Sequence, residues 1–240
     1  MAQRKLKAAA IAAAAVATAA PAAAMEPKPL VFWGFQGEQF EYRAGDDENV
    51  LAWDVDAFVG TDELRFLWRS EAEYLTGEEV FETLENQARL ETPISTFFNL
   101  AGGVRVDTPE GEDRVYGVIG LHGLAPQWFE IDADAFLSED GDPSLRFDAE
   151  YEGLLTNRLI LTPSVEIDLP LSDDDVAGVG AFAPTLEIGA RLSYDLVDRA
   201  VAPYVGVHYE RAFGETADLL EDEGEDAGQL FGVVGVRLLF

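Results

Sequence analysis

The chain has 240 residues, no cysteine, and 46 acidic against 16 basic residues, which gives a formal net charge of -30. Without cysteine it can form neither disulfide bonds nor thiolate metal sites, and so strong a negative charge disfavours binding to nucleic acid. The sequence is nevertheless 48% hydrophobic and 11% aromatic, which excludes a wholly disordered chain. The fold must therefore separate a large apolar surface from a large acidic one.

Residues 1–24 have the pattern of a signal peptide. Three basic residues stand near the start, residues 8–20 form an apolar segment, and Ala22 to Ala24 offer a small-residue cleavage site. An uncleaved anchor would need about 20 apolar residues, and this alanine-rich segment is shorter. We therefore expect an exported protein whose mature domain is residues 25–240. Cleavage removes three basic and no acidic residues, so the charge of -30 becomes -33.

After this segment, apolar side chains recur at every second position. From Phe129 to Leu137, for example, they alternate with Glu130, Asp132 and Asp134. A period of two over about ten residues is typical of a strand with one apolar and one polar face. The pattern predicts twelve strands, at residues 31–43, 50–59, 64–74, 80–91, 95–107, 114–124, 128–137, 144–155, 158–169, 180–196, 200–211 and 228–240. No segment approaches the roughly 18 successive apolar residues of a membrane-spanning helix.

The predicted connections alternate in character along the chain. Tight connections lie at residues 60–63, 92–94, 125–127, 156–157 and 197–199. Longer and more acidic connections lie at residues 44–49, 75–79, 108–113, 138–143, 170–179 and 212–227. Short turns at one rim, longer loops at the other and an even number of strands are the pattern of a bacterial outer-membrane barrel. We therefore predict an all-β fold, an antiparallel transmembrane β-barrel of about twelve strands, surrounded by outer-membrane lipid.

The distribution of side chains favours this barrel over a soluble sandwich. In a sandwich the apolar faces pack on each other, whereas in a membrane barrel they meet lipid and the polar faces line the lumen. Charged residues occur in the middle of the predicted strands, and the chain ends on Phe240 at the close of an alternating strand, as exported barrels do. Aromatic residues lie near strand ends, where a membrane barrel has its girdles, at Tyr42, Trp53, Tyr74, Trp128, Tyr151 and Tyr209.

The polar faces supply candidate lumen residues. Thirteen are acidic: Glu71, Glu73, Glu130, Asp132, Asp134, Asp148, Glu150, Glu152, Glu166, Asp168, Glu187, Asp195 and Glu210. Six are basic: Arg65, Arg69, Arg105, Arg146, Arg191 and Arg237. Two interpretations stay open, an internal salt-bridge network that fills the barrel and an acidic conduit that attracts cations. The strands predicted at 31–43 and 80–91 have mixed faces and are left unassigned.

Several blocks of the sequence resemble one known family. They are LAWDVDA at 51–57, GLAPQWFE at 123–130, YEGLLTNRLILTP at 151–163, EIGARLSY at 187–194, APYVGV at 202–207 and GETA at 214–217. Together they resemble the copper resistance protein B family, over about residues 35–240. The resemblance implies an outer-membrane barrel that binds or exports copper for copper resistance and works with periplasmic copper-handling proteins. No organic cofactor is expected.

One departure from that family bears on the metal. Its members commonly carry a Met- and His-rich segment ahead of the barrel, and such soft ligands suit copper. Here residues 25–30 contain one methionine and no histidine, so we expect any copper ligands to lie in the barrel. By alternation His122 and His208 both point into the lumen, too far apart to share an ion. His208 and Glu210 are the candidate metal ligands, and an ordinary hydrogen-bonded lumen residue is the alternative.

Other functions remain open at this point. A small cation-preferring porin, or a structural barrel with no copper role, would have the same strand pattern. The connection at 214–226 has seven acidic and no basic residues but lacks the spacing of an EF-hand, which indicates a solvated loop. A hydrolase would need an oriented Ser–His pair, for which Ser193 and His208 on neighbouring predicted strands are candidates. No G-x-S-x-G motif is present, so we expect no enzyme activity.

Overall fold

The computed structural model describes residues 29–46, 48–109, 113–174, 176–197, 199–224 and 226–240. Its elements are β1 (Phe32–Ala44), β2 (Asn49–Gly60), β3 (Arg65–Leu75), β4 (Val80–Pro93), β5 (Phe98–Asp107), β6 (Arg114–Ala125), β7 (Phe129–Ser138), β8 (Pro143–Tyr151), β9 (Gly153–Leu154), β10 (Leu159–Pro170), β11 (Thr185–Tyr194), β12 (Val201–Ala212), α2 (Gly214–Glu223) and β13 (Gly228–Leu239). The predicted signal peptide, residues 1–24, lies outside the described residues.

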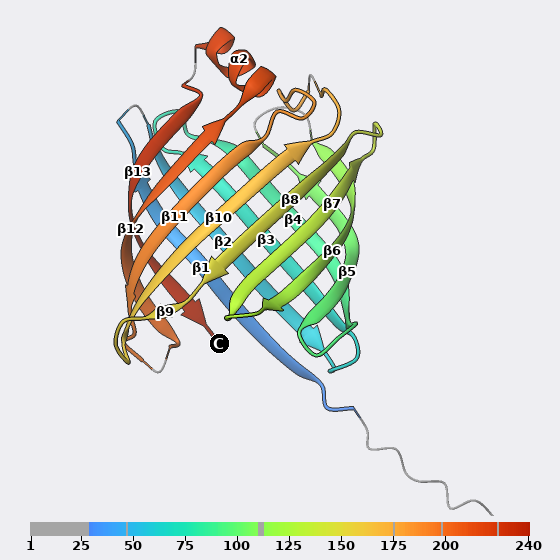
Figure 1. Ribbon diagram of the computed structural model, residues 1–240, viewed down its shortest axis with the longest axis vertical. Helices are drawn as coiled ribbons and strands as arrows, with labels where there is room; N and C mark the ends of the chain where they lie inside the picture. Colours follow the sequence, from blue (N-terminus) through green and yellow to red (C-terminus); the bar gives the residue numbers. More distant parts are fainter. Residues whose placement is uncertain (1–28, 47, 110–112, 175, 198, 225) are drawn as a thin grey trace, which may run out of the picture.

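The strands form one antiparallel sheet that closes on itself (Figure 1). Closure is made between β1 and β13, for example where Tyr42 lies opposite Val234. Strands β8 and β9 pair one after the other with β10, so together they occupy a single position in the barrel. The prediction of an all-β antiparallel barrel with twelve strand positions is therefore confirmed. None of the described helices is long and apolar enough to cross a membrane.

Most strand ends lie within a few residues of the predicted ends, and the differences concentrate near residue 180 and after residue 212. The strand predicted at 180–196 begins only at Thr185, because Pro184 lacks the N–H that a strand ladder needs. The segment predicted as a plain loop at 212–227 contains α2, which is capped at its C-terminus by Gly224 with a left-handed φ of 94°. Glycine adopts that conformation without a steric penalty, and it closes many helices.

The connections divide between two rims. The turn rim contains residues 61–64, 94–97, 126–128, 155–158 and 195–200. The loop rim contains residues 45–48, 76–79, 108–113, 139–142, 171–184 and 213–227. The observed difference in length between turns and loops is smaller than the sequence predicts, because only the last two loops exceed six residues. The difference in charge is clear: every loop-rim connection contains acidic residues, whereas three of the five turns contain none.

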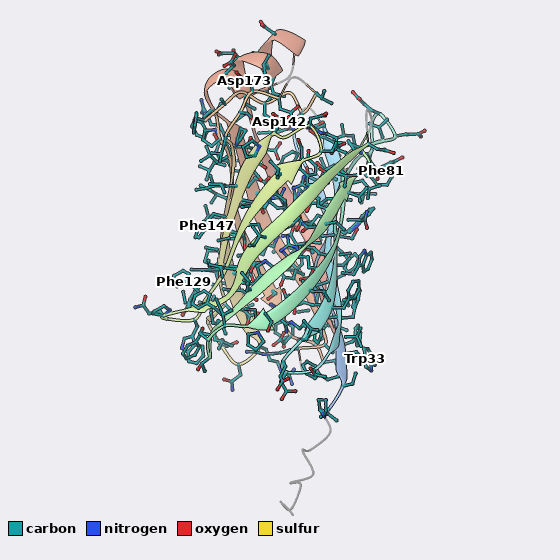
Figure 2. The ribbon with its side chains drawn as sticks, turned by 90° about the vertical axis from the view of Figure 1, so that its right-hand side faces the viewer. Trp33, Phe81, Phe129, Asp142, Phe147 and Asp173 are labelled. Atoms are coloured by element: carbon teal, nitrogen blue, oxygen red, sulfur yellow. The ribbon has the colours of Figure 1, made fainter. Side chains whose placement is uncertain are left out.

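The outside of the barrel is apolar over its whole circumference. Exposed side chains from strands around the barrel include Leu90, Val104, Ile119, Phe147, Val205 and Val234, each at least 40% exposed. Trp33 and Phe129 lie toward the turn rim and Phe81 toward the loop rim (Figure 2). The Phe81 ring packs edge-on against Trp53 and Tyr74, with ring centroids 5.8 and 5.0 Å away. An apolar belt with aromatic residues at both ends is the lipid-facing surface of a membrane barrel.

Candidate functional site

A cavity of about 380 Å³ lies in the barrel interior. Thr96 and Phe97, from the turn at 94–97, belong to its lining, so the cavity reaches the turn rim. Among the described residues, none from the loop rim lines it. Twelve carboxylate side chains and five arginines form the lining, which gives the cavity a surplus of negative charge.

The interior between this cavity and the loop rim is filled by side chains. Val50 and Phe231 are 3% and 1% exposed and form an apolar cluster with neighbouring residues of β2 and β3. The Arg105 guanidinium lies over the rings of Tyr116 and Phe136, 4.9 and 4.8 Å from their centroids. Such packing fills interior space toward the loops, and the described lining of the cavity includes turn-rim residues but no loop-rim residues.

Contacts among the loops add a cover over the loop-rim end of the barrel. Asp174, in the β10–β11 loop, forms an ion pair with Arg114 at the start of β6, so the loop reaches past the ends of β7 and β8. In the same loop, the Ser172 hydroxyl donates a hydrogen bond to Asp142 over 3.0 Å. The Thr216 hydroxyl of α2 donates to a backbone oxygen of this loop over 2.9 Å. Asp142 lies at this rim in Figure 2.

The thirteen acids predicted for the lumen lie on the interior side. Eight line the cavity: Glu71, Glu130, Asp132, Asp134, Asp148, Glu150, Glu166 and Glu187. Three do not line it, namely Glu73, Asp168 and Glu210, which lie two residues from the loop-rim ends of their strands, as Glu187 also does. Glu152 and Asp195 lie at the turn rim, where Arg199 is 3.6 Å from the first and 3.9 Å from the second.

The six arginines predicted for the lumen each hold carboxylates. Arg69 donates to Asp56 and Asp132 over 3.0 Å, and Arg146 to Glu71 and Asp168 over 2.9 Å. The remaining pairs are Arg65 with Glu91, Arg105 with Glu85 and Asp107, Arg191 with Glu41, and Arg237 with Glu152. The salt-bridge network therefore exists alongside a cavity, rather than in place of one.

Several charged residues of the lumen were not identified from the sequence. They are Glu38, Glu41 and Arg43 of β1, Asp54 and Asp56 of β2, and Glu85, Arg89 and Glu91 of β4. In β4 a signal was present, because Glu85, Gln87, Arg89 and Glu91 recur at every second position. In β1 the pairing with β2 shifts between Gly37 and Gln39, and such a bulge breaks the period of two.

The two histidines have different surroundings. Both ring nitrogens of His122 are engaged: Nδ1 lies 2.9 Å from Glu91, and Nε2 lies 3.0 Å from Asp134 and 2.6 Å from Arg89. His122 thus has the ordinary hydrogen-bonded role. Nε2 of His208 lies 3.2 Å from Nη1 of Arg43, whereas its Nδ1 is buried with no hydrogen-bond partner in the described part of the chain.

Comparison with known proteins places this barrel in a family. The family described as "Copper resistance protein B precursor (CopB)" matches residues 31–240. The chain belongs to the Copper resistance protein B family. It is 36% identical over 206 residues to "Copper resistance protein B homolog" of Pseudomonas syringae pv. tomato (strain ATCC BAA-871 / DC3000), covering 86% of this chain and 69% of that protein. It is 36% identical over 203 residues to "Copper resistance protein B" of Escherichia coli, covering 85% and 68%.

Solved structures add the architecture. The KdgM porin superposes with a TM-score of 0.51 at 12% identity, over 87% of this chain and 99% of that one. The NanC porin structure superposes with a TM-score of 0.53 at 12% identity, over 86% and 99%. These likenesses show that this member of the Copper resistance protein B family has a porin-like barrel fold.

The candidate metal ligands of this Copper resistance protein B family member lie together without forming a closed site. Oε2 of Glu210 is 3.8 Å from Nε2 of His208, and Oε2 of Glu187 is 3.4 Å from it. Within the described residues, no group of three or more His, Cys, Asp or Glu side chains is arranged to hold an ion. The structure does not bring Ser193 and His208, the candidate Ser–His pair, together. Ser193 lies opposite Tyr204, four positions along β12 from His208, and its hydroxyl donates a hydrogen bond to a backbone oxygen rather than to the imidazole.

Proposed function

We propose that this barrel contributes to copper resistance in the outer membrane by binding Cu(II) in its acidic cavity. The observation that carries the proposal is this cavity, which is lined by twelve carboxylates against five arginines and reaches the turn rim. Short turns of outer-membrane barrels face the periplasm. The cavity would then receive copper from the periplasm, and periplasmic copper-handling proteins would meet the barrel at the turn rim.

The donor set favours Cu(II) over Cu(I). Carboxylate and imidazole ligands suit Cu(II), whereas Cu(I) prefers thiolates and thioethers. The chain has no cysteine, and its two methionines, Met1 and Met25, precede the strands. The proposal involves binding of copper as cargo and includes neither an organic cofactor nor a catalysed reaction.

Binding and conductance measured together test the proposal. Purified barrel in detergent is titrated with Cu(II), Cu(I) and Ca(II) by calorimetry, and the same sample is studied in planar lipid bilayers. We expect Cu(II) to bind, Cu(I) and Ca(II) to bind more weakly, and the bilayers to show little conductance. Asp148→Asn with Glu150→Gln, which removes two cavity carboxylates, should weaken the Cu(II) isotherm.

The contrary result is equally clear. Cation-selective conductance without copper binding would favour the second candidate, a small cation-preferring porin, for which the acidic lining is the supporting observation. If the barrel shows neither copper binding nor conductance, both the copper-binding and the porin functions are rejected, and a structural barrel remains.

A further inference from the structure

The Arg43 side chain of β1 extends across the lumen to charged groups from other strands. Its Nη1 contacts the carboxylate of Glu73 on β3 and lies 3.2 Å from Nε2 of His208 on β12. Two more carboxylates approach the same imidazole nitrogen, Glu187 at 3.4 Å and Glu210 at 3.8 Å. A permanently charged guanidinium therefore lies among one imidazole and several carboxylates.

The contact with Arg43 fixes the proton of His208. A guanidinium can only donate hydrogen bonds, so Nε2 accepts and the neutral ring carries its proton on Nδ1. That Nδ1 is buried and has no hydrogen-bond partner among the described residues. His208 as a whole is only 3% exposed. An unpartnered buried donor costs stability. The fold nevertheless holds the ring with its Nε2 lone pair aimed at Arg43, the arrangement that a metal ion requires.

The two glutamates beside His208 are unfavourably placed for a barrel without a metal. Glu187 of β11 and Glu210 of β12 lie directly opposite each other in the sheet. Like charges in that position repel. Among the described residues, His208 is the only basic side chain that lies within 4 Å of the carboxylate of Glu187 or Glu210. A divalent cation between them and His208 would remove the repulsion.

We propose that Arg43 occupies a divalent-metal site as a competing cation, and that Cu(II) binds there by displacing its guanidinium. The ligands would be Nε2 of His208 and the carboxylates of Glu73, Glu187 and Glu210, contributed by β3, β11 and β12. One imidazole with carboxylate oxygens is a donor set for Cu(II). This inference rests on the proposed copper binding, and it specifies the site and the step that controls access to it.

Displacement of Arg43 is feasible because its other main partner stays satisfied. Glu41 accepts hydrogen bonds from Nε and Nη2 of Arg191, over 2.9 and 2.8 Å, and from the Tyr204 hydroxyl over 2.8 Å. Its bond from Nε of Arg43, 2.7 Å long, is therefore one of several. Arg43 also lines the cavity of about 380 Å³, which gives the guanidinium room to move.

A matched pair of variants separates this site from a general change in charge. Arg43→Gln removes the competing cation from His208. Arg69→Gln removes the same charge from the same cavity, but Arg69 contacts Asp56 and Asp132 rather than a histidine. Cu(II) affinity is measured by calorimetry on each detergent-folded barrel, and the copper electron paramagnetic resonance spectrum reports nitrogen ligands.

We expect Arg43→Gln to raise the Cu(II) affinity by about tenfold or more and Arg69→Gln by less than about threefold, because a charge at contact distance acts more strongly than a distant one. The Cu(II) spectrum should show coupling to one imidazole nitrogen. That coupling should disappear when His208→Ala is added to Arg43→Gln, and should persist when His122→Ala is added instead.

Equal gains in affinity for the two variants, or nitrogen coupling that survives His208→Ala, would overturn the site while leaving copper binding by the barrel intact. Failure of all variants and of the unmodified barrel to bind Cu(II) would overturn the proposed function itself. If Arg43→Gln does not fold, Glu187→Gln with Glu210→Gln in the unmodified background is decisive. That change should weaken Cu(II) binding about tenfold, and an unchanged isotherm would reject the site.

Discussion

The ion pair between Arg89 of β4 and Asp134 of β7 offers a quantitative test of how the barrel interior is held together. Their side chains are 0% and 3% exposed, and Nη2 of Arg89 lies 2.8 Å from Oδ2 of Asp134. Within the described residues, Asp134 is the carboxylate that Arg89 contacts. Asp134→Asn preserves the shape but removes the charge, which leaves a buried guanidinium uncompensated. Removing one partner of a buried pair costs about 3–5 kcal/mol.

Asp132→Asn provides the control two residues away on the same strand. The Asp132 side chain is 19% exposed, and its partner Arg69 keeps two hydrogen bonds to Asp56, each 3.0 Å long. Because a partly solvated pair with a second carboxylate loses little, we expect a loss of about 1 kcal/mol or less.

Urea unfolding of both variants in lipid vesicles, followed by tryptophan fluorescence, gives the free energy of unfolding by linear extrapolation. The folded fraction is checked beforehand by the heat-dependent migration of the barrel on gels. A loss of unfolding free energy below about 1 kcal/mol for Asp134→Asn, or equal losses for the two variants, would refute the conclusion that burial makes the Arg89–Asp134 pair important for stability.

Three further predictions concern the closed end, the strand contacts and the loops. Phe231→Ala should cost about 3–5 kcal/mol and raise the bilayer conductance above that of the unmodified barrel; an unchanged conductance would contradict a lumen closed by this cluster. Gly103→Ala puts a Cβ 2.1 Å from a backbone oxygen of β4 and should prevent folding, whereas Gly117→Ala meets open space and should fold normally; equal yields of folded barrel would show that the strands can separate there. Asp174→Asn removes an ion pair to β6 and should speed proteolysis within 171–184, so unchanged digestion would show that the pair does not restrain the loop.

The barrel could be predicted from the sequence because lipid outside and a polar lumen inside give each strand two unlike faces. Strand positions followed from this alternation alone. The helix α2 did not, because its ten residues are mostly acidic and small, and Thr216 contacts another loop rather than an apolar core. Its stability depends on tertiary contacts that no local pattern contains.

The strands with unassigned faces, β1 and β4, contain pairing irregularities. The register of β1 shifts after Gly37, and β4 shifts where Tyr74 of β3 pairs with Phe81 after Glu73 has paired with Thr83. An extra residue in one strand transfers the following side chains to the other face. The effect is large here, because these strands supply Arg43 and Arg89.

The pairing of lumen charges could not be predicted from alternation, which gives a face but not a height or a partner. Arg43 illustrates the difficulty, since it contacts Glu73 two strands away in one direction and His208 two strands away in the other. Such contacts depend on barrel closure and strand tilt, which fix the heights at which side chains from distant strands meet. The candidate pair of His208 and Glu210 was therefore identified without Arg43, the residue that contacts the same nitrogen.

The lumen carboxylates differ in how far basic side chains compensate them. Glu85 of β4 pairs with Arg105 at 2.8 Å and with Arg146 at 3.4 Å. The cavity lining also includes Asp54, Asp148 and Glu150, which form no ion pair with a basic side chain in the part of the chain described here. A lumen that only needed filling would gain nothing from unpaired carboxylates, because each is costly to keep away from bulk water. The uneven pairing therefore supports the proposed cation binding over a purely structural interior.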